Sequence, residues 1–234
     1  MADKIVVVDF SGTLTMPFVA EEAHLLRCDM IGLKRPTPEE HKKQHGTKAH
    51  YDIIKEHLAK KFGVSDEMKI RCVQNYGSEI ELSGKDVKTM IMTDLFRDAN
   101  YQIAAEKGLK MFPEGMLNAL LAVQKKGYKL AIVSGTRTDI ITGIFAITKC
   151  PVKFDYVYGQ DPVLSRDDSE KLLDELAKKG QIMWIIGDKM SDIEPAKKFG
   201  AKTIFVKWGH PTGGEEKFAD FSISNAKEIE KIIS

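Results

Sequence analysis

The sequence is poor in cysteine and has no long apolar run. Its three cysteines among 234 residues, Cys28, Cys72 and Cys150, form no Cys-x-x-Cys pair. An odd number at irregular spacing indicates neither a zinc site nor a disulfide framework, and favours buried thiols in a reducing compartment. No run approaches the roughly 18 apolar residues of a membrane helix, and the run that follows Asp3 and Lys4 is too short for a signal peptide. We therefore expect a cytoplasmic protein.

An excess of charge of one sign is also missing. The chain has 35 Lys and Arg against 34 Asp and Glu, a formal net charge of +1. Without a global field there is no general attraction for nucleic acid or an anionic membrane, so neither is expected as a partner. Hydrophobic residues make up 43% and charged residues 29% of the chain. That composition predicts a folded domain, with room for a smaller inserted one.

What the sequence does contain is an alternation of short apolar runs and helical patterns. The runs are rich in β-branched or aromatic residues and bounded by Gly, Asp or Lys, which predicts strands. The predicted strands are Ile5–Val8, Leu130–Val133, Phe154–Tyr158, Ile182–Ile186 and Thr203–Val206. The predicted helices are Glu114–Lys126, Thr138–Thr148, Asp168–Lys179, Ser191–Phe199 and Ala226–Ile233. This alternation predicts an α/β fold, a Rossmann-like doubly wound parallel sheet with helices on both faces.

Residues 16–107 break the alternation and contain no convincing strand. The patterns there predict helices over Pro38–Phe62, Asp66–Gln74 and Lys85–Glu106. We therefore predict a core domain of residues 1–15 and 108–234, interrupted by an all-helical domain of residues 16–107. Because both ends of this insert return to the carboxyl edge of the sheet, a cap over that edge is the favoured interpretation. A separate helical module is the alternative.

Acidic and hydroxyl residues follow the ends of three predicted strands. In chain order they are Asp9 with Ser11, Gly12 and Thr13, then Ser134 with Gly135, then Asp188 with Asp192. The carboxyl ends of parallel strands share one edge of the sheet, which is where ligands bind, so these residues are expected to converge.

This set of residues suits phosphoryl transfer. The Asp9 carboxylate would attack phosphorus and form an aspartyl-phosphate. The hard oxygens of Asp9 and Asp188 suit Mg²⁺, which would offset the repulsion between carboxylate and phosphate. The Ser134 hydroxyl, the Gly135 amide, the amides of the Ser11–Thr13 turn and the Lys171 ammonium would donate to phosphate oxygens. Gly12 would permit the close backbone approach.

At these residues the sequence resembles the haloacid dehalogenase-like superfamily. "DFSGTLT" is similar to its first motif, which the nucleophilic Asp leads, and "LAIVSG" to its second. "DDSEKLLDELAKKG" is similar to the lysine-bearing third motif, and "IIGDKMSD" to the fourth. The resemblance covers residues 1–15 and about 110–210, with the insert at the position of that superfamily's C1 cap.

The resemblance implies a role for each matching position. Asp9 would be nucleophile and metal ligand, and Asp188 and the Ser11 carbonyl would also bind Mg²⁺. Asp192 would ligate through water or orient that shell, with a helix-terminal charge as the alternative. Ser134 and Lys171 would bind phosphate. Lys153 and Lys178 are rivals of Lys171. The implied function is a Mg²⁺-dependent phosphatase of a small phosphorylated metabolite.

Ser11 departs from the pattern of most phosphatases of this superfamily, which have a second Asp as general acid and base. A serine hydroxyl has no useful pKa near neutrality, so help of about 10²–10⁴-fold is expected to be lost. Leaving groups that need no proton would then be favoured. Glu21, Glu22 and His24, which follow the first motif, are candidates to replace the missing group.

Other interpretations remain open beside the phosphatase. A phosphonate hydrolase would need a cap lysine that forms a Schiff base, and a catalytically weak member would bind a phosphorylated ligand without turnover. Asp188 argues against a halide-releasing dehalogenase, whose fourth motif lacks this Asp. His41 and His45 share a helix face but have no third metal ligand at sensible spacing. "WGHPTGGEE", residues 208–216, indicates a flexible surface loop and no nucleotide site.

Overall fold

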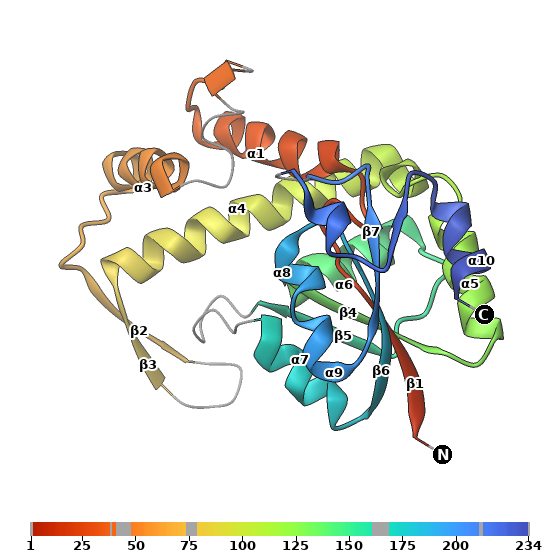
Figure 1. Cartoon of the computed structure of the whole chain (residues 1–234). Coiled ribbons are helices and arrows are strands. Elements are labelled where there is room, and N and C mark those ends of the chain that lie inside the picture. Colours follow the sequence, from red (N-terminus) through yellow and green to blue (C-terminus); the bar gives the residue numbers. More distant parts are fainter. Residues whose placement is uncertain are drawn as a thin grey trace. The chain divides into compact units, whose positions relative to one another are not determined.

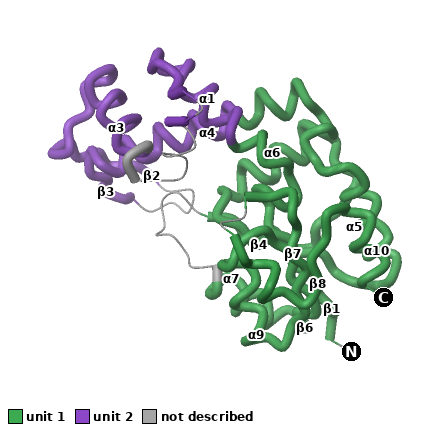
Figure 2. The backbone as a smooth tube through the Cα atoms, turned by 45° about the horizontal axis from the view of Figure 1, so that its top comes forward, with its two compact units in different colours: residues 1–20, 100–234 green, residues 21–99 purple. Residues whose placement is uncertain are grey.

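The computed structural model of the chain describes residues 2–37, 39–40, 48–73, 79–160, 169–210 and 213–233. The chain forms two compact units, residues 1–20 with 100–234 and residues 21–99 (Figure 2). The boundaries fall inside two helices, α1 (Pro17–Ile31) and α4 (Gly84–Lys107). The insert predicted over residues 16–107 begins five residues earlier and ends eight residues later than the smaller unit, residues 21–99.

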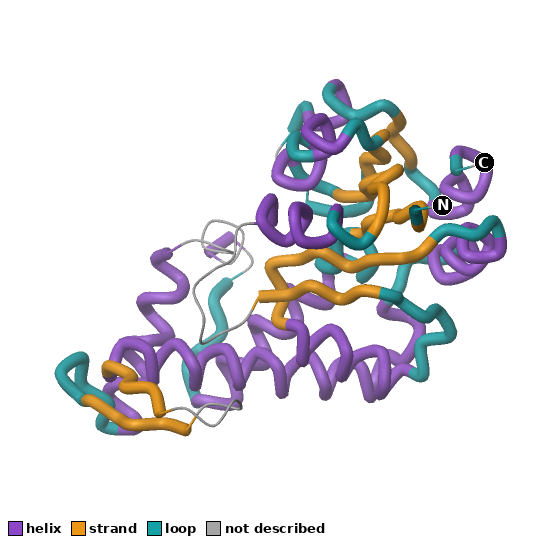
Figure 3. The backbone as a smooth tube through the Cα atoms, turned by 90° about the horizontal axis from the view of Figure 1, so that it is seen from below, coloured by secondary structure: helices purple, strands orange, loops and turns teal. Residues whose placement is uncertain are grey.

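The larger unit is built on a six-stranded parallel sheet (Figures 1 and 3). Its strands are β1 (Asp3–Val8), β4 (Lys129–Arg137), β5 (Tyr156–Gln160), β6 (Gly180–Gly187), β7 (Lys202–Val206) and β8 (Phe221–Ile223). They lie in the order β5-β4-β1-β6-β7-β8, and every neighbouring pair is parallel. The chain builds one half of the sheet outward from β1 and then returns to build the other half from β6. This is the doubly wound topology that the sequence predicts, with its switch point between β1 and β6.

Helices cover both faces of this sheet. They are α5 (Met116–Lys125), α6 (Thr138–Thr148), α7 (Ser169–Ala177), α8 (Met190–Ile193), α9 (Ala196–Phe199) and α10 (Ile229–Ile232). On one face Ile5 and Val7 of β1 belong to a buried cluster with Leu176 of α7. Side chains alternate along a strand, so Val6 and Val8 point to the other face, where they are fully buried as well. Burial on both faces explains why these strands are continuous apolar runs in the sequence.

The structure differs from the prediction at the C-terminal side of the sheet. The sixth strand, β8, has three residues and carries too little apolar pattern to be predicted. The helix predicted over Ser191–Phe199 is divided into α8 and α9, with Pro195 between them. Proline lacks the N–H that a continuous helix needs and clashes with the preceding turn. The helix predicted over Ala226–Ile233 begins as the 3-10 turn Ala226–Glu228 and continues as α10.

The smaller unit contains helix α3 (Lys48–Phe62) and most of α1 and α4, with a core that includes Ile31, Ile54 and Leu58. It also contains an antiparallel pair, β2 (Lys69–Val73) and β3 (Glu79–Ser83). The prediction of an all-helical insert with a helix over Asp66–Gln74 is therefore wrong. The sequence of β2 alternates between exposed and partly buried residues, and a period of two residues favours a strand over a helix.

Helix α4 confirms the prediction of a long helix over Lys85–Glu106, and α3 occupies the C-terminal part of the helix predicted over Pro38–Phe62. His41 and His45 lie outside the described residues. Within the part of the chain that the structure describes, no helix combines the length and the apolar character needed to cross a membrane.

Candidate active site

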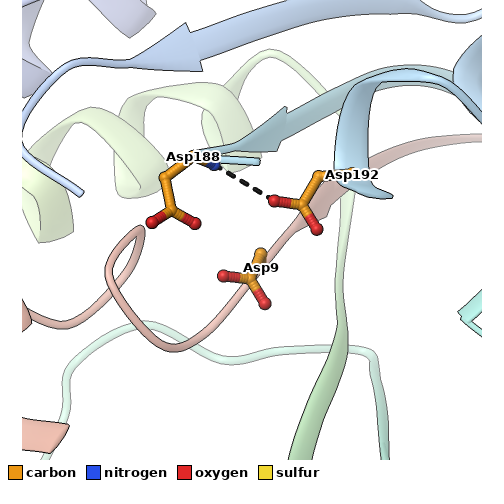
Figure 4. A group of neighbouring side chains, drawn as sticks. All are labelled: Asp9, Asp188 and Asp192. Atoms are coloured by element: carbon orange, nitrogen blue, oxygen red, sulfur yellow. Dashed lines mark hydrogen bonds between the residues drawn. The ribbon is translucent and has the colours of Figure 1, made fainter. Parts of the chain in front are cut away.

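Three carboxylates meet at the switch point of the sheet. Asp9 directly follows β1, Asp188 directly follows β6, and Asp192 lies in α8 (Figure 4). One carboxylate oxygen from each lies within 4.8 Å of the others. The Asp9 amide donates to the Ile186 carbonyl at 2.9 Å, which continues the pairing of β1 and β6 to the first carboxylate. Two neighbouring parallel strands thus deliver two acids to one point, as the sequence predicts.

The turn after Asp9 closes tightly beneath Asp188. The Leu14 amide donates to the Asp9 carbonyl at 3.2 Å, and Gly12 adopts a φ of +85°. A Cβ atom on Gly12 would lie 2.6 Å from Asp188 Oδ2, so glycine is needed for both its backbone angle and its size. Thr13 is fully buried, and its hydroxyl donates to Asp188 Oδ1 at 3.3 Å. Ser11 is partly buried in the same turn, and its backbone pairs with that of Thr15 in an isolated parallel β-bridge.

Ser134 reaches Asp9 from the strand on the other side of β1. The pairing of β4 with β5 is irregular between Val133 and Arg137, so Ser134 sits at an interruption of the ladder. Its hydroxyl donates to Asp9 Oδ1 at 3.0 Å and accepts from the Thr136 amide at 3.3 Å. The structure therefore brings Ser134 to the predicted nucleophile. Gly135 is exposed, with open space where a side chain would begin.

Asp192 is held by the backbone at the start of α8. Its Oδ2 accepts from the amides of Asp188 at 3.1 Å and Lys189 at 3.0 Å. A Cβ atom on Gly187 would lie 2.3 Å from Asp192 Cβ, which explains the glycine before Asp188. Asp192 therefore accepts from backbone amides at the start of α8 and also lies beside Asp9 and Asp188.

Burial and electrostatic interactions with neighbouring groups shift the pKa values of the three acids. Burial, followed by the charges of Asp192 and Asp188, holds the pKa of Asp9 well above its ordinary value. Burial and the charge of Asp188 raise the pKa of Asp192 to about 6. Burial also acts to raise the pKa of Asp188, but hydrogen bonds from His210 and the charge of Lys189 outweigh it and leave that pKa lowered. Such a group of carboxylates is costly without a cation.

The donor set fits a divalent cation. The oxygens of Asp9, Asp188 and Asp192 are the hard ligands that Mg²⁺ prefers, and few protein ligands suffice because Mg²⁺ keeps several waters. A cation would relieve the repulsion that raises the pKa of Asp9 and the pKa of Asp192.

Lys171 is not placed in contact with this cluster. It lies near the start of α7 with an exposed side chain, and the described residues show no hydrogen bond or ion pair between it and the three acids. Its rival Lys178 pairs with Glu175. The lysine whose charge lowers the pKa of Asp9, of Asp188 and of Asp192 is Lys189, which the sequence analysis did not single out.

The candidates for a replacement acid or base belong to the smaller unit. His24 is buried there, with its ring 4.8 Å from that of Phe96 and its Nδ1 2.8 Å from Arg27 Nη2. These contacts favour a core role for His24. Glu21 is exposed and Glu22 is partly buried.

The segment Trp208–His210 belongs to the acidic site, although the sequence analysis predicts a flexible surface loop there. The indole N–H of Trp208 donates to the Thr13 carbonyl at 3.1 Å, and the His210 amide donates to Asp188 Oδ2 at 2.6 Å. The sequence contains one indication of this role. The segment follows β7, and the carboxyl end of that strand lies at the same edge of the sheet as Asp9 and Asp188.

The chain is thus an α/β protein with a doubly wound sheet. Its candidate site lies at the switch point, where carboxylates from the ends of the central strands converge. The family model described as haloacid dehalogenase-like hydrolase matches residues 35–206. The chain therefore belongs to the haloacid dehalogenase-like hydrolase family, which confirms the resemblance seen in the sequence.

Curated relatives of the chain are phosphatases. A phosphoglycolate phosphatase of Aquifex aeolicus is 27% identical over 154 residues, which cover 61% of this chain and 71% of that protein. The phosphoglycolate phosphatase of Escherichia coli (strain K12) is 28% identical over 127 residues, 53% of this chain and 50% of that protein. The match thus spans only half the length of the second relative.

Solved structures share the fold. A haloacid dehalogenase-like family hydrolase of Streptococcus pneumoniae has a TM-score of 0.60 at 14% identity, over 99% of both chains. CbbY from Rhodobacter sphaeroides, in complex with phosphate, has a TM-score of 0.61 at 17% identity, over 98% of this chain and 96% of that one.

Proposed function

We propose that the chain is a Mg²⁺-dependent phosphatase that acts on a small phosphorylated metabolite through an aspartyl-phosphate on Asp9. The observation that carries this proposal is the convergence of Asp9, Asp188 and Asp192 within 4.8 Å at the switch point of the sheet. Membership of a hydrolase family whose curated relatives are phosphatases supports it.

The proposed chemistry assigns one task to each residue of the site. The Asp9 carboxylate attacks phosphorus, and the Ser134 hydroxyl, which donates to Asp9 Oδ1, fixes its orientation. Bound Mg²⁺, held by Asp9, Asp188, Asp192 and the Ser11 carbonyl, would supply the positive charge that keeps Asp9 ionised beside a phosphate. The amides of the Ser11–Thr13 turn and of Gly135 donate to the phosphate oxygens.

A cationic side chain is also part of the proposed phosphate site. Lys171 is the sequence-based candidate and Lys189 the one whose charge acts on all three acids. Both lysines remain in the proposal, and the variants Lys171→Met and Lys189→Met would separate them.

Ser11 favours leaving groups that depart without a proton. A serine cannot protonate the leaving oxygen or deprotonate the attacking water near neutral pH, so aryl phosphates, acyl phosphates and anhydrides are the better substrates. Alkyl phosphates are slower, and so is hydrolysis of the aspartyl-phosphate.

The substrate class is proposed from the relatives. The curated relatives are phosphoglycolate phosphatases, and one structure of CbbY contains xylulose-(1,5)bisphosphate. Small phosphorylated acids and sugars are therefore the first compounds to test. We assign the choice among them to the unit of residues 21–99, acting as the cap that the sequence predicts. The cytoplasmic location expected from the sequence stays a prediction.

The test is phosphate release from 4-nitrophenyl phosphate and phosphoglycolate, with and without Mg²⁺. The chain should release phosphate only with Mg²⁺, and Asp9→Asn should be inactive. A wild-type chain that binds phosphate but releases none would support a ligand-binding member that lacks turnover. Inactivation by borohydride in the presence of a phosphonoaldehyde would instead support a phosphonate hydrolase, since a lysine Schiff base would then be trapped.

A further inference from the structure

The segment Trp208–His210 contacts both halves of the acidic site. The Trp208 indole N–H donates to the Thr13 carbonyl at 3.1 Å, in the turn that follows Asp9. Two residues later the His210 amide donates to Asp188 Oδ2 at 2.6 Å, and His210 Nδ1 lies 3.7 Å from the same oxygen. One short segment after β7 therefore joins the end of β1 to the end of β6.

The packing around Asp188 leaves no room for an added methyl group. A Cβ atom on Gly209 would lie 2.2 Å from Asp188 Cβ. A Cβ atom on Gly12 would lie 2.6 Å from both Asp188 Oδ2 and His210 Nδ1. Three segments that are far apart in the sequence thus enclose one carboxylate, and Asp188 has no exposed surface.

These contacts fix the orientation of the Asp188 carboxylate. Its Oδ1 accepts from the Thr13 hydroxyl at 3.3 Å, and its Oδ2 accepts from the His210 amide. An ionised carboxylate has about four acceptor positions on its two oxygens, so further positions remain for a metal ion. A ligand held in this way loses little freedom when the metal binds, which strengthens binding.

We propose that Trp208, Gly209 and the backbone amide of His210 are positioning residues that hold a preformed Mg²⁺ site. Trp208 acts through Thr13, by fixing the turn whose hydroxyl orients Asp188. Gly209 lets the segment approach, and the His210 amide holds the second carboxylate oxygen. This inference rests on the proposed function, since it concerns the same metal site.

The first test is Mg²⁺ affinity by titration calorimetry on Trp208→Phe, which removes the indole N–H and keeps an aromatic ring. Affinity should fall about 10-fold, the size seen when a residue that orients a metal ligand is changed. The matched control is Trp184→Phe, because Trp184 is the other tryptophan, lies in β6 and packs beside Phe221. That control should bind Mg²⁺ within about twofold of wild type.

A second pair of variants separates backbone from side chain. Gly209→Ala should lower the affinity about 10–100-fold. His210→Ala keeps the amide that donates to Asp188 and removes only the imidazole, whose Nδ1 lies 3.7 Å from Asp188 Oδ2, so its loss of affinity should be smaller than that of Gly209→Ala. If Gly209→Ala does not fold, Thr13→Val removes the other donor to Asp188 and is expected to match Trp208→Phe. Turnover of Trp208→Phe should recover when Mg²⁺ is raised, which a general folding defect would not allow.

The outcomes distinguish this inference from the proposed function. A wild-type chain that binds no Mg²⁺ overturns the proposed function and the inference together. Folded Trp208→Phe and Gly209→Ala variants with wild-type affinity overturn the inference alone. A loss in His210→Ala as large as in Gly209→Ala overturns the assignment to the backbone amide.

Discussion

Asp9 and Asp188 take opposite electrostatic roles although they lie at the same point of the sheet. Burial and two neighbouring acids hold the pKa of Asp9 well above its ordinary value. Burial opposes ionisation of Asp188 too, but the hydrogen bonds from His210 and the charge of Lys189 lower its pKa. Asp188 is thus the more readily ionised of the two, and a bound cation would lower the raised pKa of Asp9, the proposed nucleophile.

An Asp at position 11 would test whether Ser11 slows the reaction by lacking a general acid and base. Ser11→Asp should raise the rate of alkyl phosphate hydrolysis about 10²–10⁴-fold, because it supplies a general acid and base. The kcat/KM for 4-nitrophenyl phosphate should change less, since it reports formation of the aspartyl-phosphate and that leaving group needs no proton, whereas kcat should rise because hydrolysis of the aspartyl-phosphate becomes faster. Ser11→Asn is the control, because it has a similar shape and carries no titrating proton. Equal rates in the two variants would show that another residue already performs the proton transfer.

Variants of the two candidate lysines, Lys171 and Lys189, should differ in how kcat/KM depends on pH. Lys189 lowers the pKa of all three acids, so Lys189→Met should move the acid limb of kcat/KM to higher pH by up to about one unit. Lys171 has no such effect, and Lys171→Met should leave the limb in place while lowering phosphate affinity. The measurement is kcat/KM against pH at saturating Mg²⁺. A shifted limb in Lys171→Met would reverse the assignment.

At the scale of elements, the acids that follow β1 and β6 lower the stability of the fold as the pH rises. The pKa of Asp192 is raised to about 6, so this group contributes stability below its unfolded pKa that is lost as pH rises through about 6. Asp9, whose pKa is also raised, acts in the same direction. Mg²⁺ should restore the loss, because it binds the ionised acids.

This linkage predicts how the free energy of unfolding depends on pH with and without Mg²⁺. Without Mg²⁺, Asp192→Asn should be more stable than wild type at pH 7.5 by about 1–3 kcal/mol, and by little at pH 4. The stabilisation of wild type by Mg²⁺ should grow between pH 5 and pH 7.5. Thermal unfolding by calorimetry measures both, and about 1 kcal/mol corresponds to about 2–4 °C at this size. Wild type and variant with equal stability at pH 7.5 would contradict the account.

The elements that the sequence predicts well are those buried on both faces. The strands β1, β4 and β6 are continuous apolar runs, and their order along the chain leads to Asp9, Ser134 and Asp188 at one edge. The pair β2 and β3 was missed because its half-exposed alternation is a weak signal among charged residues. Trp208–His210 is predicted from the sequence as part of a flexible surface loop, whereas in the structure Gly209 packs closely against Asp188. Such contacts depend on the tertiary fold and leave no local pattern.

At the scale of the whole molecule, the two units have separate cores with different chemistry. The smaller unit buries Arg27, which is 1% exposed, donates to the Met92 carbonyl at 3.4 Å and lies over the rings of Tyr51 and Phe96. Burial lowers the pKa of Arg27 to about 10, so it remains charged at neutral pH. The described part of this unit therefore buries the cations Arg27 and Lys88, whereas the larger unit brings together the acids Asp9, Asp188 and Asp192.

A change at Arg27 should act on the smaller unit alone. Arg27→Met keeps the bulk but removes hydrogen bonds inside a core, and should destabilise residues 21–99 by about 1–3 kcal/mol. Hydrogen exchange should rise in α1 and α4, while Mg²⁺ affinity stays the same. Arg35→Met is the control, because Arg35 forms an exposed pair with Asp29 that is worth about 0–1 kcal/mol. Loss of Mg²⁺ affinity in Arg27→Met would show that the metal site depends on the smaller unit.

The measurement that tests the central claim most directly is a crystal structure with Mg²⁺ and trifluoroberyllate, an analogue of the phosphoryl group. The account predicts beryllium bonded to an Asp9 oxygen and one Mg²⁺ within about 2.1 Å of oxygens from Asp9 and Asp188. Mg²⁺ bound elsewhere, or beryllium fluoride absent from Asp9 while Mg²⁺ is present, would contradict it.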